Sequence, residues 1–412
     1  MNLLVLTPLV PAPPHDGDKL RLYYFLKELK KRGHQIDLFC LTRVKSDLVQ
    51  AEALHPFCRK IYLERLNGVD LFFNLLGGTL LGQSLNVASH FSPKLRDGLR
   101  AYWKSEEGRS IDAVLAHRLR MAPMAFESNP NVPVVLELTD CLTAYTGRLK
   151  SLKGARWTAR LLARWDHWLL KREEVEWSNR AAATLLISER DAEALVSIGV
   201  SPEKVQVVPN GVSLTPVSKN KKRPDLYPAG QPVVCFAGNM GYFPNEDGIL
   251  WFHEKVWPLV KQSVPNALLA AVGGQPRARL KRRAKPGEFI VTGWVPEIEP
   301  YVAFSTLTIA PLRLAAGMQN KVALSLGLGV PVAATSAAAG WLEAKGQAFL
   351  SVADDPKGLA EAVIQILQNP RPAKAKALRG KAYILKNYTW PLSGRKMDQI
   401  LKRVAGQRKT NF

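Results

Sequence analysis

Short apolar runs alternate with amphipathic helical patterns along most of the chain. A helical pattern over residues 19–32 is followed much later by long helical stretches between 148 and 179. Apolar runs of strand length separate them at 3–6, 35–41, 113–116 and 134–137. Runs of this length that alternate with helices are typical of a parallel sheet covered by helices. The part of the chain just before residue 113 is interpreted as an apolar loop region.

The same alternation begins again after residue 232. Strands are expected at 233–237, 267–272, 289–292, 306–310 and 330–333, and helices at 247–261, 318–328 and 356–368. The segment 210–231 between the two series is rich in Pro, Lys and Ser, which favours a domain boundary. We therefore predict an α/β protein with domains at 1–211 and 212–387. An amphipathic helical tail at 388–412 follows them.

Composition agrees with two soluble domains. The chain has 412 residues, 47% of them hydrophobic, which is too long for one core and sufficient for two. Its four cysteines show no metal-ligand spacing, so a reducing cytosol is expected. Neither a signal peptide nor a transmembrane helix is expected, since the most apolar segment, 69–87, is interrupted by Asp70, Asn74 and glycines.

The formal net charge of +22 indicates a polyanionic partner or a solvated basic surface. No helix-turn-helix, zinc-finger or RNP-type signature accompanies the basic residues, so nucleic acid is not expected as a partner. The segment from Arg148 to Arg172 carries eight lysines or arginines and one aspartate, and tryptophans border its basic stripe. Such a helix suits an anionic membrane surface, or it packs on the core with a solvated basic edge.

One glycine-containing loop leads into a helix that could hold a phosphate. Between the strand ending at 310 and the helix beginning near 318, the sequence PLRLAAGMQNK places Gly317, Gln319, Asn320 and Lys321 at the helix N-terminus. Backbone N–H groups and the helix dipole bind anions at such a position. Arg313 of the same loop is a second possible cationic ligand.

Three further turns follow predicted strands and carry similar signals. The proline-rich turn after the first strand ends at Gly17, with Lys19 and Arg21 in the next helical turn. Cations are unfavourable at a helix N-terminus, so a bound anion is one interpretation, and an Asp-capped helix with solvated cations is the other. The glycine-opened turn GNMGYFPN, with Gly238, Asn239 and Met240, could also hold a phosphate, and the loop TGWVPEIEP, with Val295, follows another predicted strand.

These motifs together resemble group 1 (family 4) glycosyltransferases. The openings PAPPHDGDKLR and GNMGYFPN resemble the branch encoded with exopolysaccharide clusters, and AGMQNKVALSLGLGVPVAAT is similar to the donor-binding segment of the family. The resemblance implies a GT-B fold, in which two Rossmann-like domains bind acceptor and nucleotide and a C-terminal helix crosses back to the first domain. It also implies that Gly17, Gly238, Asn239, Met240 and Val295 contact the nucleotide-sugar donor. In the same way, it implies that VVPNGV, with Asn210 and Gly211, is a structural joint between the domains.

The resemblance further implies the reaction. A hexosyl group would pass from a UDP- or GDP-linked sugar to a hydroxyl of a polysaccharide or lipid-linked glycan. Anomeric configuration would be retained, without a metal or another cofactor. A cell-envelope role at the inner face of the plasma membrane is a hypothesis from the basic, tryptophan-bordered segment between Arg148 and Arg172. His117 and Asp140, which both follow predicted strands, would act at the reacting sugar, or they are a structural histidine and a helix cap.

Three positions depart from the family pattern. The family's two paired glutamates fall on Ala315 and Ala323, and a later one falls on Ala339. Losing the carboxylate that holds a ribose diol would remove about 1.5–3 kcal/mol of binding. Glu343 is near in sequence and could compensate. The alternative interpretation is a degenerate glycosyltransferase that binds nucleotide or a partner without catalysis.

Overall fold

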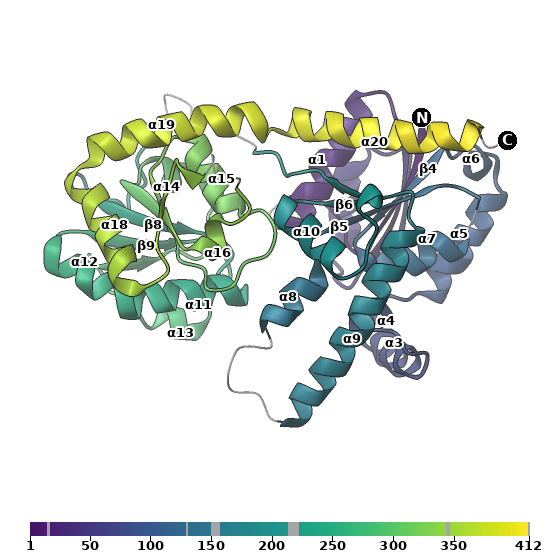
Figure 1. Cartoon of the computed structure of the whole chain (residues 1–412), viewed down its shortest axis with the longest axis horizontal. Coiled ribbons are helices and arrows are strands. Elements are labelled where there is room, and N and C mark those ends of the chain that lie inside the picture. The colour runs from purple at the N-terminus through teal and green to yellow at the C-terminus, as the bar shows by residue number, and fades with distance from the viewer. Residues whose placement is uncertain (15–16, 129–130, 150–156, 213–221, 343–346, 411–412) are drawn as a thin grey trace. The chain divides into compact units, whose positions relative to one another are not determined.

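The computed structural model describes residues 1–14, 17–128, 131–149, 157–212, 222–342 and 347–410. It divides into two compact units (Figure 1). Unit 1 comprises Met1–Asn210 and Trp390–Phe412, and unit 2 comprises Gly211–Thr389. Glu343 and part of the basic segment, including Lys153 and Arg156, lie outside the described residues.

Unit 1 is built on a parallel sheet with the strand order β3-β2-β1-β4-β5-β6-β7. The strands are β1 (Asn2–Thr7), β2 (Gln35–Thr42), β3 (Lys60–Arg65), β4 (Ala113–His117), β5 (Val134–Thr139), β6 (Ala183–Leu186) and β7 (Val205–Val207). Leu4 and Leu6 enter one buried cluster, whereas Leu3 and Val5 enter another, so both faces of the sheet are covered. The four predicted strands are confirmed, and β3, β6 and β7 are additional.

The helices of unit 1 include several in the stretch that the sequence pattern left as loop. They are α1 (Gly17–Lys31), α2 (Asp47–Gln50), α3 (Gly68–Leu80), α4 (Leu85–Ala88), α5 (Pro93–Lys104), α6 (Glu106–Arg109), α7 (Ala122–Ser128), α8 (Leu142–Leu149), α9 (Trp157–Arg180) and α10 (Glu189–Ser197). The interpretation of an apolar loop region before residue 113 is therefore wrong. Helix α3 is apolar on most sides, which hides the helical period, but Asn67 and Asp70 cap its start reciprocally.

Unit 2 contains the second parallel sheet, in the order β10-β9-β8-β11-β12-β13. Its strands are β8 (Val233–Ala237), β9 (Leu268–Val272), β10 (Phe289–Val291), β11 (Leu307–Ala310), β12 (Val332–Ala334) and β13 (Ser351–Val352). Its helices include α11 (Phe243–Trp251), α12 (Trp257–Ser263), α13 (Ala278–Lys281), α14 (Glu299–Ala303), α15 (Asn320–Gly327), α16 (Ser336–Ala339), α18 (Pro356–Gln368) and α19 (Pro370–Asn387). The predicted helix 247–261 is interrupted by a π-helical segment, Phe252–Val256. The other expected elements are present within a few residues of their predicted ends.

The last helix, α20 (Trp390–Thr410), returns to unit 1 as expected. The Trp390 ring stacks on Tyr24 of α1 with centroids 4.7 Å apart, and Met397 and Leu401 enter the buried cluster of β1. His34 Nε2 lies 2.7 Å from Asp398 Oδ1. In the described part of the chain, no helix has the length and apolar character needed to cross a membrane.

Candidate functional site

The turn after β8 brings two backbone segments into direct contact at the carboxyl edge of the unit 2 sheet. The Gly238 N–H donates to the Val272 carbonyl at 3.0 Å, and the Met240 N–H donates to Gly274 at 2.8 Å. A Cβ on Gly273 would lie 1.9 Å from the Gly238 oxygen, so no side chain fits there. Ligands of open α/β sheets bind at this edge. Gly273 therefore allows the two backbone segments to pack directly against each other at the edge where a ligand would bind.

Lys321, at the second position of α15, points toward this turn. Its Cε lies 3.4 Å from the place a Cβ on Gly238 would occupy, and its ammonium lies 5.8 Å from the centre of the Phe236 ring. The ammonium donates to Gln319 Oε1 at 3.3 Å, and no carboxylate in the described ranges pairs with it. Burial lowers the pKa of Lys321 to about 8. A partly buried cation without an anionic partner is typical of a binding site for an anion.

The N-terminus of α15 reinforces this positive site. Gln319 occupies the N-cap without a side-chain capping bond, because its amide donates instead to the Ala316 carbonyl at 2.8 Å. Gly317 just before it adopts a φ of 57°, which turns the loop into the helix. Asn320 is the first helical residue. The structure thus brings Gly238 and Lys321 together beside a helix start that no side chain caps, an arrangement suited to a phosphate.

Other predicted donor-site residues have different surroundings. Asn239 stabilises the turn itself, since its side chain accepts from the Gly241 N–H at 2.9 Å. The Met240 side chain is fully buried, and Val295 packs half-buried against the core of unit 2. The Met240 side chain is therefore not available to a ligand.

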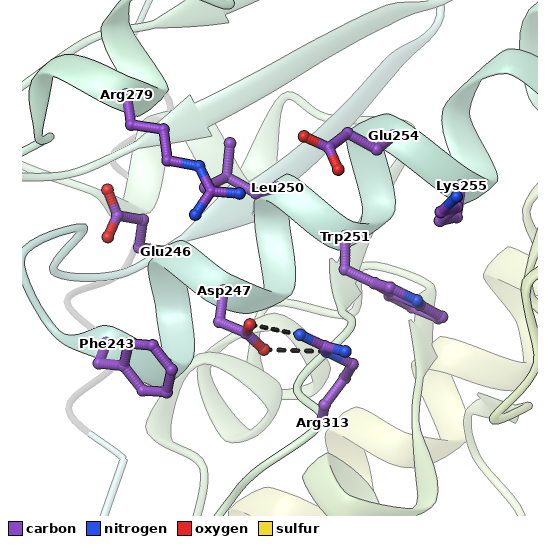
Figure 2. Close-up of a pocket in the computed structure, with 9 residues that line it drawn as sticks. All are labelled: Phe243, Glu246, Asp247, Leu250, Trp251, Glu254, Lys255, Arg279 and Arg313. Carbon is purple, nitrogen blue, oxygen red and sulfur yellow. Dashed lines mark hydrogen bonds and ion pairs between the residues drawn. The ribbon is translucent and has the colours of Figure 1, made fainter. Parts of the chain in front are cut away.

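Arg313 is engaged with the protein itself. Its guanidinium forms a bidentate ion pair with Asp247 of α11, with Nε 2.9 Å from Oδ2, and this hydrogen bonding raises the pKa of Arg313. Figure 2 shows the pair in a pocket of about 210 Å³ whose lining includes Phe243, Trp251 and Arg279. Lys321 is not part of that lining. The two cations predicted to share the donor phosphate therefore have separate surroundings, and Arg313 would have to leave Asp247 to reach a ligand.

The three alanines that replace family glutamates are all buried. Ala323 lies on α15 and is fully buried, as is Ala339 at the end of α16, and Ala315 is nearly so. Each small side chain fills a packed position with no polar group. Any hydrogen bond to a ribose diol must therefore come from other residues or from the backbone.

In unit 1, His117 and Asp140 lie at the corresponding sheet edge. His117 is the last residue of β4 and is fully buried, and its Nδ1 is hydrogen-bonded to Glu137 Oε2. His117 Nε2 is buried without a hydrogen-bond partner in the part of the chain that the structure describes. Asp140 Oδ2 lies 3.5 Å from Arg118, a residue with a φ of 70°. Strained backbone of this kind is concentrated at functional sites.

Glu137 connects this site to the first helix. It was not identified as a site residue from the sequence. Its Oε1 accepts from Arg21 Nε at 2.8 Å, and both side chains are buried. Burial by itself raises the pKa of Glu137, but the nearby charges of Arg21, His117 and Arg118 hold it below the usual range. A single glutamate in the otherwise apolar strand VVLELT was the signal that could have identified it.

The anion predicted next to Gly17 has little support in these contacts. Lys19 pairs with Asp47 at 3.2 Å. Arg21 donates to Glu137, to the Val208 carbonyl and to the Asn210 side chain. Both cations are therefore bound by groups of unit 1, whereas Gly17 is exposed at the start of α1. The Asn210 contact agrees with a structural role for the VVPNGV segment.

Two family models match the chain, one in each half. The model "Glycosyltransferase Family 4" matches residues 19–215, and the model "Glycosyl transferases group 1" matches residues 231–369. The chain is built from two glycosyltransferase domains in a GT-B fold. No curated protein sequence gives a significant match.

Solved structures support the GT-B fold over nearly the whole length. Sucrose-phosphate synthase from Thermosynechococcus elongatus is 16% identical, with a TM-score of 0.71 over 99% of this chain and 100% of that chain. Anabaena Alr3699/HepE in complex with UDP is 16% identical, with a TM-score of 0.68 over 98% and 100%. WaaG, a glycosyltransferase involved in lipopolysaccharide biosynthesis, is 15% identical, with a TM-score of 0.62 over 97% and 99%. At these identities the likeness concerns the fold.

Proposed function

We propose that this GT-B protein transfers a hexosyl group from a nucleotide-diphosphate sugar to a hydroxyl group, with retention of configuration and without a metal. Unit 2 binds the donor and unit 1 contributes the acceptor side. The partly buried ammonium of Lys321 beside Gly238, which pairs with no carboxylate of the described residues, is the observation that carries the proposal. The solved complexes of Anabaena Alr3699/HepE contain UDP or UDP-glucose, which makes UDP the first nucleotide to test and GDP the second.

The reaction requires stabilisation of a leaving diphosphate. The bond between the anomeric carbon and the diphosphate oxygen breaks, and its electron pair leaves with the nucleoside diphosphate. The acceptor oxygen bonds to the anomeric carbon on the same face, and its proton passes to the leaving phosphate oxygen. Lys321 and the N-terminus of α15 offset the developing negative charge. Because Lys321 is desolvated, its charge acts through a low local dielectric.

His117 and Asp140 act at the sugar in this proposal. Glu137 orients the His117 ring through Nδ1, which leaves Nε2 to contact a sugar hydroxyl. Asp140, held near Arg118, accepts a hydrogen bond from another hydroxyl. A His117→Ala variant should lower kcat/KM by roughly 10- to 100-fold, while nucleotide affinity stays unchanged. Equal loss of nucleotide binding would contradict this assignment.

The proposed acceptor is a polysaccharide or a lipid-linked glycan of the cell envelope. The resemblance of the two proline-containing turns to the exopolysaccharide branch supports this choice. The basic, tryptophan-bordered segment supports a location at the inner face of the plasma membrane. The predicted membrane contact of the segment from Arg148 to Arg172 is developed below with the described part of that segment.

A nucleotide panel tests the donor site. UDP, GDP, dTDP and their sugar conjugates are added to the wild type and to Lys321→Met, and thermal unfolding is followed. Ligand at 100 times its dissociation constant should stabilise the wild type by about 2.7 kcal/mol. Stabilisation by one nucleotide that is lost in the variant supports the proposal, and release of that nucleotide from its sugar conjugate in the presence of glycolipid acceptors completes it. No stabilisation by any nucleotide at millimolar concentration would refute it.

A second candidate function rests on the three buried alanines. A degenerate protein would bind nucleotide or a partner without transfer, since Ala323 and Ala339 offer no carboxylate to the donor. It would retain its biological function in Arg313→Ala and Lys321→Ala variants. Loss of function in Lys321→Ala favours the enzyme.

A further inference from the structure

Helix α3 exposes a continuous apolar stripe. Val69, Phe72, Phe73, Leu76 and Leu80 follow the spacing of one helical face. These side chains and the adjoining Leu81 are between 52% and 82% exposed. A helix facing water carries polar residues on that side, so this stripe lacks its expected partner.

The opposite side of α3 holds the helix on unit 1. Gly78 is buried, and its place against Ala88 of α4 is so close that a Cβ would lie 2.2 Å from the Ala88 Cβ. Asn74 donates from its side chain to the Phe91 carbonyl. Because these contacts fix the inner side, the exposed stripe is a stable feature of the fold.

The stripe continues onto α9 through Arg172. Its guanidinium donates to the Gly82 carbonyl just after α3, and it lies 5.5 Å from the centre of the Trp168 ring. Trp168 is 58% exposed, and Trp165 and Leu162 of α9 are exposed as well. Asp166 and Glu173 connect α9 to the start of α4 by accepting from Leu85 N and Ser84 N. Figure 1 shows α3, α4 and α9 grouped in unit 1.

The exposed charged residues of α9 beside this surface are cations, and the one charged residue of α3 is Asp70, which caps its first turn. No Asp, Glu, Lys or Arg occurs between Asp70 and Lys94. On α9, Arg164, Lys171 and Arg172 are exposed, whereas Asp166, the acidic residue between positions 162 and 172, is half-buried and bonded to α4. An apolar stripe with tryptophans and cations beside it matches the interface of an anionic bilayer.

We propose that the α3–α9 surface, formed by Val69, Phe72, Phe73, Leu76, Leu80, Leu81, Leu162, Trp165 and Trp168, docks unit 1 onto an anionic lipid bilayer. Helix α3 has 13 residues, about 20 Å in length, so it lies in the interface and does not cross the bilayer. Its apolar stripe enters the boundary between headgroups and acyl chains. The cations of α9 contact lipid phosphates. The net charge of +22 adds long-range attraction to such a surface.

The docking surface is packed beside the His117 site. Asn86 of α4 accepts from Arg120 Nε at 3.2 Å, and Arg120 lies in the short helix Leu119–Met121 that follows His117. A bilayer under α3 therefore lies near the unit 1 site. This proposal concerns attachment and does not depend on sugar transfer.

Vesicle co-sedimentation of the full chain tests the proposal without donor or acceptor. The vesicles are POPC alone or POPC with an equal amount of POPG. The variant Phe72→Ser/Phe73→Ser/Leu76→Ser removes the centre of the stripe. Its matched control is Leu48→Ser/Val49→Ser, which removes exposed apolar side chains from α2 of the same unit. Thermal unfolding shows whether each variant remains folded, which is expected because all five side chains are exposed.

We expect the wild type and the control to bind POPG vesicles equally, and the triple variant to bind at least roughly 100-fold more weakly. Arg164→Gln should weaken binding by about fivefold. Absence of wild-type binding to POPG vesicles, or equal binding by the triple variant, would overturn the proposal. A third outcome would also overturn it: the wild type self-associates with rising concentration, the triple variant alone does not, and no vesicle binding occurs. In that case the stripe faces a second copy of the chain.

Discussion

Replacing Lys321 with methionine should make the ligand-free protein more stable. The lysine side chain is partly buried, and this burial lowers its pKa from 10.5 to about 8. Each unit of difference between folded and unfolded pKa corresponds to about 1.4 kcal/mol, so protonated Lys321 costs about 3 kcal/mol at pH 7. The variant also loses the hydrogen bond to Gln319, which lowers its stability by about 1 kcal/mol. The net gain for Lys321→Met is about 2 kcal/mol.

The pH dependence of this gain has a defined sign. Between pH 8 and 10.5 the unfolded lysine holds a proton that the folded one has released, so wild-type stability rises with pH in that window. The advantage of methionine is therefore complete below pH 8 and falls to about 1 kcal/mol or less by pH 10. Nucleotide binding should change in the opposite direction, because the variant lacks the ammonium that meets the diphosphate.

Urea unfolding followed by tryptophan fluorescence at pH 7 and pH 10 measures both effects. The control is Lys357→Met, which removes an exposed lysine from the first turn of α18. It should leave stability nearly unchanged at both pH values. A Lys321→Met protein that is no more stable than the wild type at pH 7 would refute the reasoning. An equal gain at pH 10 would show that packing, and not desolvation of a charge, is responsible.

Three further changes test the packing of both units. Glu137→Gln leaves the buried Arg21 guanidinium without its carboxylate and should destabilise unit 1 by about 3–5 kcal/mol in urea unfolding. Because the folded pKa of Glu137 is depressed, this stability advantage of the wild type should disappear as pH falls below the ordinary carboxyl range. Gly238→Ala places a Cβ 3.0 Å from Asn245 Nδ2 and should weaken nucleotide binding, measured by calorimetry, at least tenfold. The control is Gly287→Ala, which should leave nucleotide binding unchanged: Gly287 also has a positive φ, but no atom lies within 4 Å of the added Cβ. Trp390→Ala should destabilise unit 1 by about 3–5 kcal/mol, measured by the urea midpoint, since its ring stacks on Tyr24; an unchanged midpoint would show that α20 does not stabilise unit 1.

Much of the candidate donor site could be predicted from local sequence. Gly238 and Lys321 lie in strand-to-helix turns, and their chemistry is evident from the residue types and from the adjacent elements. The role of Arg313 was harder to predict, because Asp247 is 66 positions away in sequence and only the fold brings the two together. The same holds for Arg21 and Glu137, which are 116 positions apart. A charged side chain is a ligand candidate in a sequence, but the partners around it decide whether it can serve as one.

The sequence by itself determined the α/β class and the two sheets, because buried strands and amphipathic helices have periods that local composition expresses. The return of the last helix was implied by the resemblance to GT-B glycosyltransferases. The sequence did not determine α3, whose apolar residues surround the helix and conceal its period. Only the tertiary structure decided which side of α3 is buried, and thus that its other side is an exposed apolar surface. Only the tertiary structure decided that the Lys321 ammonium is partly removed from water and pairs with no carboxylate of the described residues, since burial and charge pairing depend on contacts between distant segments.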